Sequence, residues 1–168
     1  MKKYLYLVIP SVLIISFLTG CASLGPRYTD VQSKGVLTPP RDQGLVIFYC
    51  LEGGMPTIYN ADDNNKLLAT MPPKTFDYAF FKPGPLHLLC GKKVNGGAIA
   101  AETILGGPLY LLQLGGQGLK PYGPINIAAG QSYYLRAHVG WSGWLEEVPE
   151  STAEENLQHC EYYHANSR

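Results

Sequence analysis

The sequence predicts a mainly β domain that ends in a short helix. Only 15% of the 168 residues are charged, while 19 are glycine and 13 are proline, so turns are frequent and solvated helical faces are few. Short runs rich in β-favouring residues, such as residues 45–50 and 75–80, alternate with these turn residues. Residues 21–168 suffice for one domain, which we expect over residues 44–164.

The first 20 residues have the layout of a signal peptide. Lys2 and Lys3 precede an apolar segment over residues 4–18, which at about 1.5 Å per residue is too short for a helix that spans a bilayer. Because both lysines would be removed with this leader, the remaining chain is slightly acidic and has no basic block. We therefore expect no nucleic-acid partner.

The sequence LTGC at residues 18–21 resembles the lipobox of bacterial lipoproteins. The resemblance implies cleavage between Gly20 and Cys21, acylation of Cys21, and an anchor in the cell envelope that two or three acyl chains make nearly permanent. Ala22 in place of Asp implies the outer membrane, with the domain facing the periplasm. An ordinary secretory leader with a coincidental cysteine is the alternative.

Residues 21–43 are interpreted as the lipidated N-terminus followed by a flexible tether. Gly-Pro at residues 25–26 and Thr-Pro-Pro at residues 38–40 interrupt any periodic pattern, and apolar residues are scattered singly. The alternative is that this segment also packs on the domain.

Three cysteines remain once Cys21 is assigned to lipid. In an oxidising compartment, Cys50, Cys90 and Cys160 predict one disulfide and one free thiol. We favour Cys90 with Cys160, because few apolar residues otherwise hold the C-terminal segment. The pairing of Cys50 with Cys160 is the alternative.

The strand predictions depend on apolar runs between turn residues. Residues 45–50 are continuously apolar, which predicts a central strand buried on both faces. The Asp- and Asn-rich residues 60–65 predict a hairpin turn, and residues 82–85 a tight turn. The expected strands are residues 45–50, 57–59, 66–69, 75–80, 86–90, 109–114, 125–127, 132–139 and 144–148.

Two further segments complete the expected domain. Residues 92–123 are interpreted as an insertion, in which residues 98–105 fit one or two helical turns and residues 115–123 a loop. Near the C-terminus, Ser151 and Glu154 have the spacing of a capping box. They predict a short helix with Ala153, Leu157 and Cys160 on one side.

Several of these strand ends and turns together resemble a family of small bacterial lipoproteins, whose shared domain is catalogued as domain of unknown function 2846. The matching stretches are residues 44–49, 56–59 and 81–84 with His87, then residues 129–136 and 148–150. The resemblance implies a small antiparallel β-sandwich, immunoglobulin-like or related, and no agreed activity, catalytic residue or cofactor. Cys50 stands where a basic residue is common in the family, and residues 92–123 are long for it.

Each motif that suggests chemistry has a simpler interpretation. Asp62, Asp63, Asn64 and Asn65 lack the spacing of a calcium loop and favour a hairpin turn. Residues 140–144 differ from a nucleophile elbow and favour a turn flanked by Trp141 and Trp144. His159, Cys160 and His164 do not have the spacing of a zinc site. Glu146 and Glu147 are adjacent on a predicted strand, so they point to opposite faces and cannot act on one substrate as paired carboxylates. Residues 115–118 are not followed by the Lys of a phosphate-binding loop. We expect no bound metal and no cofactor.

Two features favour an interaction surface. The C-terminal third is rich in aromatic residues, including Trp141 and Trp144, for which core packing is the alternative. Residues 96–116 are apolar and Gly-rich, so Ile99, Leu105 and Leu109 are candidates for an exposed patch, with packing on the sandwich as the alternative.

The sequence thus predicts a lipid-anchored envelope protein that acts as a binding or structural interaction module, in contact with the membrane and with an envelope protein partner, and not as an enzyme. An accessory subunit of an envelope transport or secretion assembly is one alternative. An envelope hydrolase is another, and it requires His87, His138, Asp77 and Glu102 to converge in one cleft.

Overall fold

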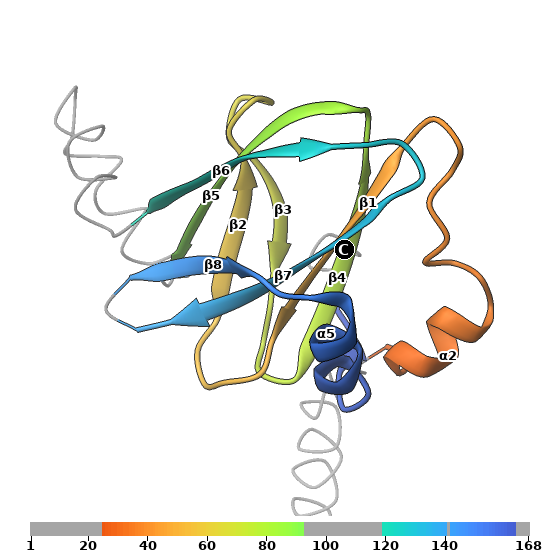
Figure 1. Ribbon diagram of the computed structural model, residues 1–168. Coiled ribbons are helices and arrows are strands. Elements are labelled where there is room, and N and C mark those ends of the chain that lie inside the picture. Colours follow the sequence, from red (N-terminus) through yellow and green to blue (C-terminus); the bar gives the residue numbers. More distant parts are fainter. Residues whose placement is uncertain (1–24, 93–118, 141, 164–168) are drawn as a thin grey trace, which may run out of the picture.

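A computed structural model describes residues 25–92, 119–140 and 142–163 (Figure 1). The described elements are two helices, α2 (Tyr28–Ser33) and α5 (Glu150–Leu157), and nine strands: β1 (Gly44–Cys50), β2 (Pro56–Asn60), β3 (Lys66–Thr70), β4 (Thr75–Phe81), β5 (Gly84–Lys92), β6 (Lys120–Ile127), β7 (Ser132–Val139), β8 (Gly143–Glu147) and β9 (Glu161–Tyr162). Neither helix is long and apolar enough to cross a bilayer.

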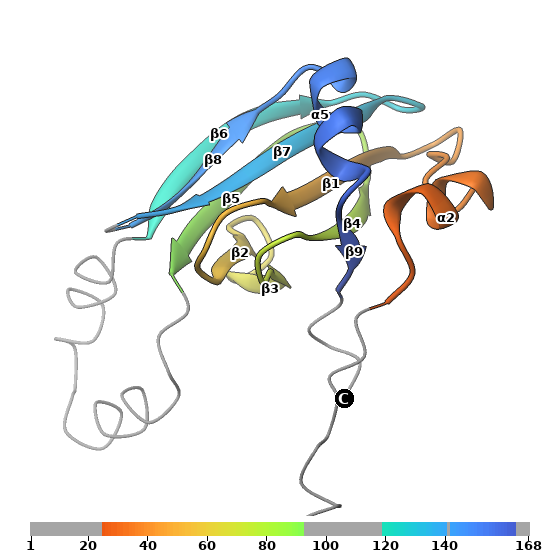
Figure 2. The same ribbon diagram turned by 90° about the horizontal axis from the view of Figure 1, so that it is seen from below.

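The strands form two packed sheets, so the predicted β-sandwich is confirmed. One sheet has five strands in the order β8-β7-β1-β4-β9, and the other has four in the order β3-β2-β5-β6. Figures 1 and 2 show the two sheets as layers, with α5 over the outer face of the five-stranded sheet. The sandwich is not wholly antiparallel, because β1 pairs with β7 and β4 pairs with β9 in parallel.

Strand β1 lies at the centre of the five-stranded sheet, and all seven of its residues are buried. Val46 and Phe48 face a core between the two sheets. Leu45 and Ile47 face a second core between the five-stranded sheet and the two helices. Burial on both faces explains why the run is continuously apolar instead of alternating, as the sequence predicted.

The turn predictions are also confirmed where the structure describes them. β2 and β3 form an antiparallel hairpin around residues 61–65. Asn64 and Asn65 have φ angles of 49° and 55° there, a left-handed conformation that asparagine tolerates. β4 and β5 are separated by residues 82–83, within the predicted tight turn.

The prediction of a flexible tether is wrong for residues 25–37, which pack on the sandwich. Helix α2 buries Tyr28 and Val31 in the second core. The Tyr28 backbone N–H donates to the Cys160 carbonyl at 3.0 Å, and the Gly25 N–H donates to the Tyr162 carbonyl at 2.9 Å. This segment therefore closes over the C-terminal residues, as the alternative interpretation required.

The C-terminal helix was predicted, but its cap was not. Pro149 occupies the N-cap position of α5 and Ser151 lies inside the helix, so no side chain caps it and the capping box is wrong. Ala153 and Leu157 are fully buried, as is Cys160 just beyond the helix. The three residues expected on one side thus face the second core.

Strand β6 begins earlier than predicted, at Lys120 instead of residue 125. It is an edge strand of the four-stranded sheet, where a strand tolerates Pro121 and Pro124. Near the start of β6 the two sheets approach each other closely. A Cβ added to Gly143 of β8 would lie only 2.8 Å from backbone atoms of Gly91 of β5. This contact closes the side of the sandwich where β6 and β8 lie.

Candidate functional site

The described residues of the hydrolase hypothesis do not converge. His87 lies on β5, where its side chain is exposed, and it contacts the β2–β3 turn. His138 lies on β7 and contacts Glu146 of β8. Asp77 is buried in β4, at a position that alternation directs between the sheets, as it does Ala79. These three residues occupy three different layers, and Glu102 lies outside the described residues.

Asp62 and His87 instead hold a turn in place. The His87 backbone N–H donates to Asp62 Oδ2 at 2.8 Å, and His87 Nδ1 lies 3.0 Å from Asp62 Oδ1. The hydrogen bond from the His87 backbone holds the pKa of the Asp62 carboxyl below its ordinary value. The carboxylate therefore fixes the β2–β3 turn to β5.

The predicted disulfide is wrong, since Cys50, Cys90 and Cys160 are all buried free thiols. Cys90 lies in the core between the sheets, whereas Cys160 lies in the second core on the other face of the five-stranded sheet. Burial raises the pKa of Cys90 to about 12 and that of Cys160 to about 11. The C-terminal segment is held by buried apolar residues and by the α2 hydrogen bonds.

No group of His, Cys, Asp and Glu with the geometry of a metal site occurs among the described residues. Of the residues considered as metal ligands and rejected from their spacing, Cys160 donates its thiol hydrogen to the Asn156 carbonyl at 3.6 Å. His159 is exposed beside a cavity of about 500 Å³ between α2 and α5. Arg27 and Glu154 both line that cavity, so its lining carries charges of both signs.

Strand β8 carries the candidate site, because its two faces present different functional groups. Trp144 and Glu146 occupy alternate positions on the outer face, where Glu146 lies 2.9 Å from His138. Leu145 enters the core between the sheets, and Glu147 lies on that same side. The opposite orientation of Glu146 and Glu147 is the one predicted from their adjacent positions.

Trp144 is held in a defined orientation although it is exposed. Its ring stacks on the His138 ring, with centroids 4.8 Å and planes 4° apart. The Lys120 ammonium lies 5.9 Å from the centroid of the Trp144 ring, which allows a cation–π contact. His138 is itself positioned by Glu146 Oε2. We call these four residues, Trp144, His138, Glu146 and Lys120, the Trp144 surface.

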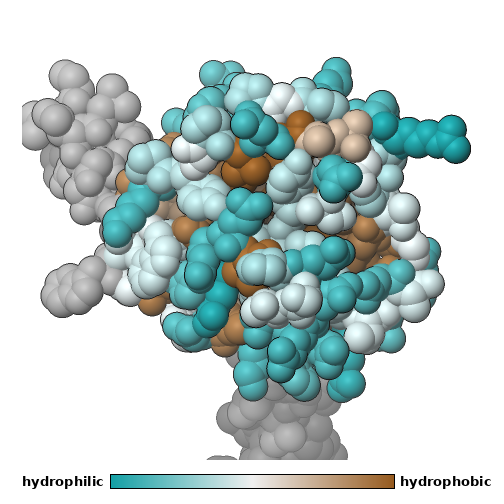
Figure 3. Space-filling model, viewed as in Figure 1, coloured by the Kyte–Doolittle hydropathy of each residue, from teal (hydrophilic) through white to brown (hydrophobic). Residues whose placement is uncertain are grey.

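Exposure separates Trp144 from the other aromatic residues. Among large hydrophobic side chains in the described ranges, Trp144 and Val36 are the exposed ones, each at 41% of its full accessible surface. In contrast, Tyr134 is buried and donates its hydroxyl hydrogen to Glu150 Oε1 at 3.0 Å. In Figure 3, hydrophobic residues form small separate areas on the visible face. Core packing therefore does not account for Trp144.

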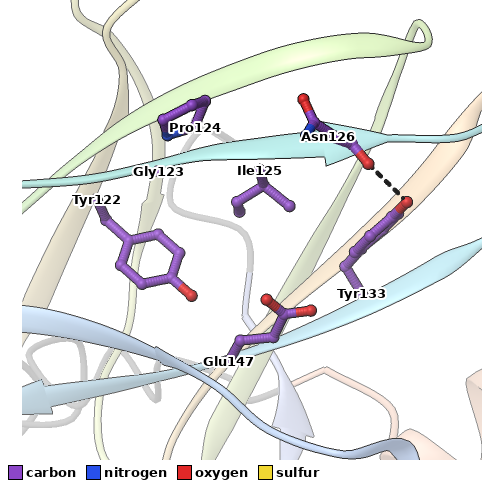
Figure 4. Close-up of a pocket in the computed structure, with 7 residues that line it drawn as sticks. All are labelled: Tyr122, Gly123, Pro124, Ile125, Asn126, Tyr133 and Glu147. Carbon is purple, nitrogen blue, oxygen red and sulfur yellow. Dashed lines mark hydrogen bonds between the residues drawn. The ribbon is translucent and has the colours of Figure 1, made fainter.

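The other side of β8 borders a cavity of about 410 Å³ where the two sheets meet. Residues 122–126 of β6 line it, together with Tyr133 of β7 and Glu147 of β8. Figure 4 shows the Glu147 carboxylate between the side chains of Tyr122 and Tyr133. Sequence reasoning missed this cavity, because β6 and β8 belong to different sheets and no motif links them.

The remaining residues and motifs considered from the sequence, whether as sites or as rejected candidates, lie outside the described residues. They are Gly20 and Cys21 of the lipobox-like sequence, Ile99, Leu105, Leu109 and Trp141 of the predicted interaction surface, residues 115–118, and His164. Residues 139 and 143, which flank the predicted turn at Trp141, pair across the β7–β8 hairpin. Comparisons of the chain with protein-family models, curated proteins and solved structures return no match.

Proposed function

We propose that this protein is a lipid-anchored protein of the bacterial cell envelope that acts as a binding module through the Trp144 surface. The observation that carries the binding role is the exposure of Trp144, which is 41% accessible although it is stacked on His138. A tryptophan side chain offers a large contact area, and one that is already ordered loses little conformational entropy on binding.

Binding is favoured over hydrolysis by the placement of the candidate acid and base groups. His138 and Glu146 form a pair on the outer face of the five-stranded sheet, but His87 and Asp77 lie in other layers. The hydrolase hypothesis needs these groups around one substrate. A surface that binds a partner protein needs only an accessible anchor residue with polar groups around it. Trp144 is this anchor, and Glu146 and Lys120 supply the polar groups.

The anchor rests on residues 18–21 and on the resemblance to the lipoprotein family with domain of unknown function 2846. Cys21→Ser removes the only side chain that can accept the diacylglyceryl group at this position. The variant should remain an uncleaved precursor and take up no labelled fatty acid. Ser23→Ala, two residues away, is the matched control. Normal maturation of Cys21→Ser would refute the anchor.

The binding role is tested by capture from detergent-solubilised envelopes. A protein that co-purifies with the wild-type chain should be depleted about tenfold with Trp144→Ala, because loss of a central aromatic anchor costs about 1–2 kcal/mol or more. Val36→Ala is the control, since Val36 has the same fractional exposure in a different part of the fold. Equal capture by both variants would contradict the role of the Trp144 surface.

A further inference from the structure

The cavity between β6 and β8 combines three groups that could surround a cation. Tyr122 and Tyr133 are half-buried and pack against the core between the sheets, so their rings form fixed walls. Glu147 is exposed at the end of β8 and its carboxylate lies between these two side chains (Figure 4). The cavity of about 410 Å³ is the size of a small-molecule site.

The hydroxyl group of Tyr133 already has two hydrogen-bond partners. Tyr133 donates to the Asn126 carbonyl and accepts from the Ala128 N–H, both at 2.9 Å. Because these two hydrogen bonds occupy the hydroxyl group of Tyr133, this residue offers a ligand its aromatic ring more than its hydroxyl group.

The electrostatic character of the cavity follows from Glu147. Burial raises the pKa of the Tyr122 hydroxyl above its ordinary value, and the Glu147 carboxylate raises it further, so the phenol stays neutral. Within the described ranges, no Lys, Arg or His forms an ion pair with Glu147, whereas Glu146 pairs with His138. The site thus has one carboxylate and two aromatic rings, and nothing basic among the residues that line it.

We propose that this cavity binds a small alkylammonium ion, with Glu147 as its counter-charge and the rings of Tyr122 and Tyr133 as cation–π partners. An ammonium group gains from both the carboxylate and the aromatic faces. An anion is repelled by Glu147, and a single carboxylate is a poor site for a divalent metal. This site is separate from the Trp144 surface, so the two proposals can fail independently.

Choline chloride is the probe, and 3,3-dimethyl-1-butanol is its neutral counterpart of the same shape. Both are titrated into the ¹⁵N-labelled full-length chain in non-ionic detergent, with sodium chloride matched to the choline arm. Choline should shift the amide signals of the residues that line the cavity and carry an amide hydrogen, and it should bind about tenfold more tightly than the neutral alcohol. These residues are Tyr122, Gly123, Ile125, Asn126, Tyr133 and Glu147. Equal binding of the two, or no shift with choline, would overturn the proposal.

Two substitutions locate the site. Glu147→Gln should weaken choline binding about tenfold, while Glu155→Gln, which removes the same charge from the exposed side of α5, should leave it unchanged. Tyr122→Leu keeps an apolar side chain but removes the ring, and should weaken binding severalfold. Equal effects of Glu147→Gln and Glu155→Gln would show general charge attraction and overturn the proposal.

Phosphocholine distinguishes the source of the ammonium group. A lipid head group carries a phosphate next to the ammonium, so binding equal to that of choline identifies this cavity as able to accept a head group. Weaker binding, expected if the phosphate is repelled by Glu147, identifies a free cation as the ligand. Both results support an alkylammonium site. If neither choline nor phosphocholine binds in the cavity, the proposal is contradicted.

Discussion

His138 of β7 and Trp144 of β8 lie directly opposite each other, with their rings parallel and the centroids 4.8 Å apart. Cross-strand contacts of this kind stabilise an edge strand and also fix the orientation of an exposed side chain. The stack therefore links the stability of the β7–β8 hairpin to the presentation of Trp144.

This stack predicts a measurable coupling between the two side chains. In a double-mutant cycle of His138→Ala and Trp144→Ala, the free energies of unfolding should be non-additive by about 0.5–1.5 kcal/mol. Urea denaturation of the four proteins measures the coupling energy. Additivity within experimental error would mean that the stack does not hold Trp144 in place.

Gly143 should not tolerate a side chain. A Cβ at this position would meet backbone atoms of Gly91 at 2.8–2.9 Å, and backbone of a central strand cannot move away easily. We expect Gly143→Ala to lower the free energy of unfolding by about 1–3 kcal/mol. Gly53→Ala is the control, because a Cβ there would have no heavy atom within 4 Å apart from those of its own residue and its two chain neighbours. Equal denaturation midpoints for the two variants would refute the close approach of β5 and β8.

Helix α2 should contribute to global stability. Tyr28 is 2% exposed, and its ring contacts Phe76 edge to face with centroids 5.4 Å apart. Tyr28→Ala should cost about 3–5 kcal/mol by thermal or urea unfolding, as removal of a buried aromatic ring does. Thr29→Ala, exposed on the same helix, should change stability by less than about 0.5 kcal/mol. A small effect of Tyr28→Ala would restore the tether interpretation.

The buried thiols predict a loss of stability in alkali. Burial raises the pKa of Cys90 to about 12 and of Cys160 to about 11, above the thiol's ordinary value of 9.0. Below pH 9 each thiol keeps its proton in both the folded and the unfolded chain. Above pH 9 the thiols of the unfolded chain lose their protons, while the buried thiols of the folded chain retain them. Stability should fall as pH rises from 9 toward 12, by at most about 1.4 kcal/mol per pH unit for each thiol.

Cys90→Ala checks the origin of that slope. The variant lacks one of the two thiols whose pKa is raised by burial. Its free energy of unfolding should therefore fall less steeply with pH than that of the wild-type chain. The slope, and not the absolute stability, is the quantity compared, because the substitution also leaves a small cavity. Identical slopes would show that Cys90 does not titrate in the predicted way.

Local sequence patterns predicted the elements whose formation depends on local chemistry. The apolar run of β1 indicated a strand buried on both faces, and the Asn-rich turn at residues 60–65 indicated the β2–β3 hairpin. Features that depend on distant parts of the chain were missed. Helix α2 has only Tyr28 and Val31 on its buried side, and β9 is two residues long, so neither gives a periodic pattern.

The candidate site shows the same division. Trp144 was a candidate for an interaction surface from sequence, with core packing as the alternative, and the structure shows that its side chain is exposed. The opposite faces of Glu146 and Glu147 followed from strand alternation. The stack on His138 depends on the register of β7 against β8, and the approach of Lys120 depends on how the two sheets close. The disulfide prediction failed because spacing does not show that Cys90 and Cys160 face different cores.

Site-specific photo-crosslinking in living cells tests the proposed function most directly. A photoreactive amino acid replaces Trp144 in one full-length variant and Val36 in another, so that two equally exposed positions are compared. We expect a discrete crosslinked adduct at position 144 and none at position 36. Absence of an adduct at position 144, or the same adduct at both positions, would contradict binding through the Trp144 surface.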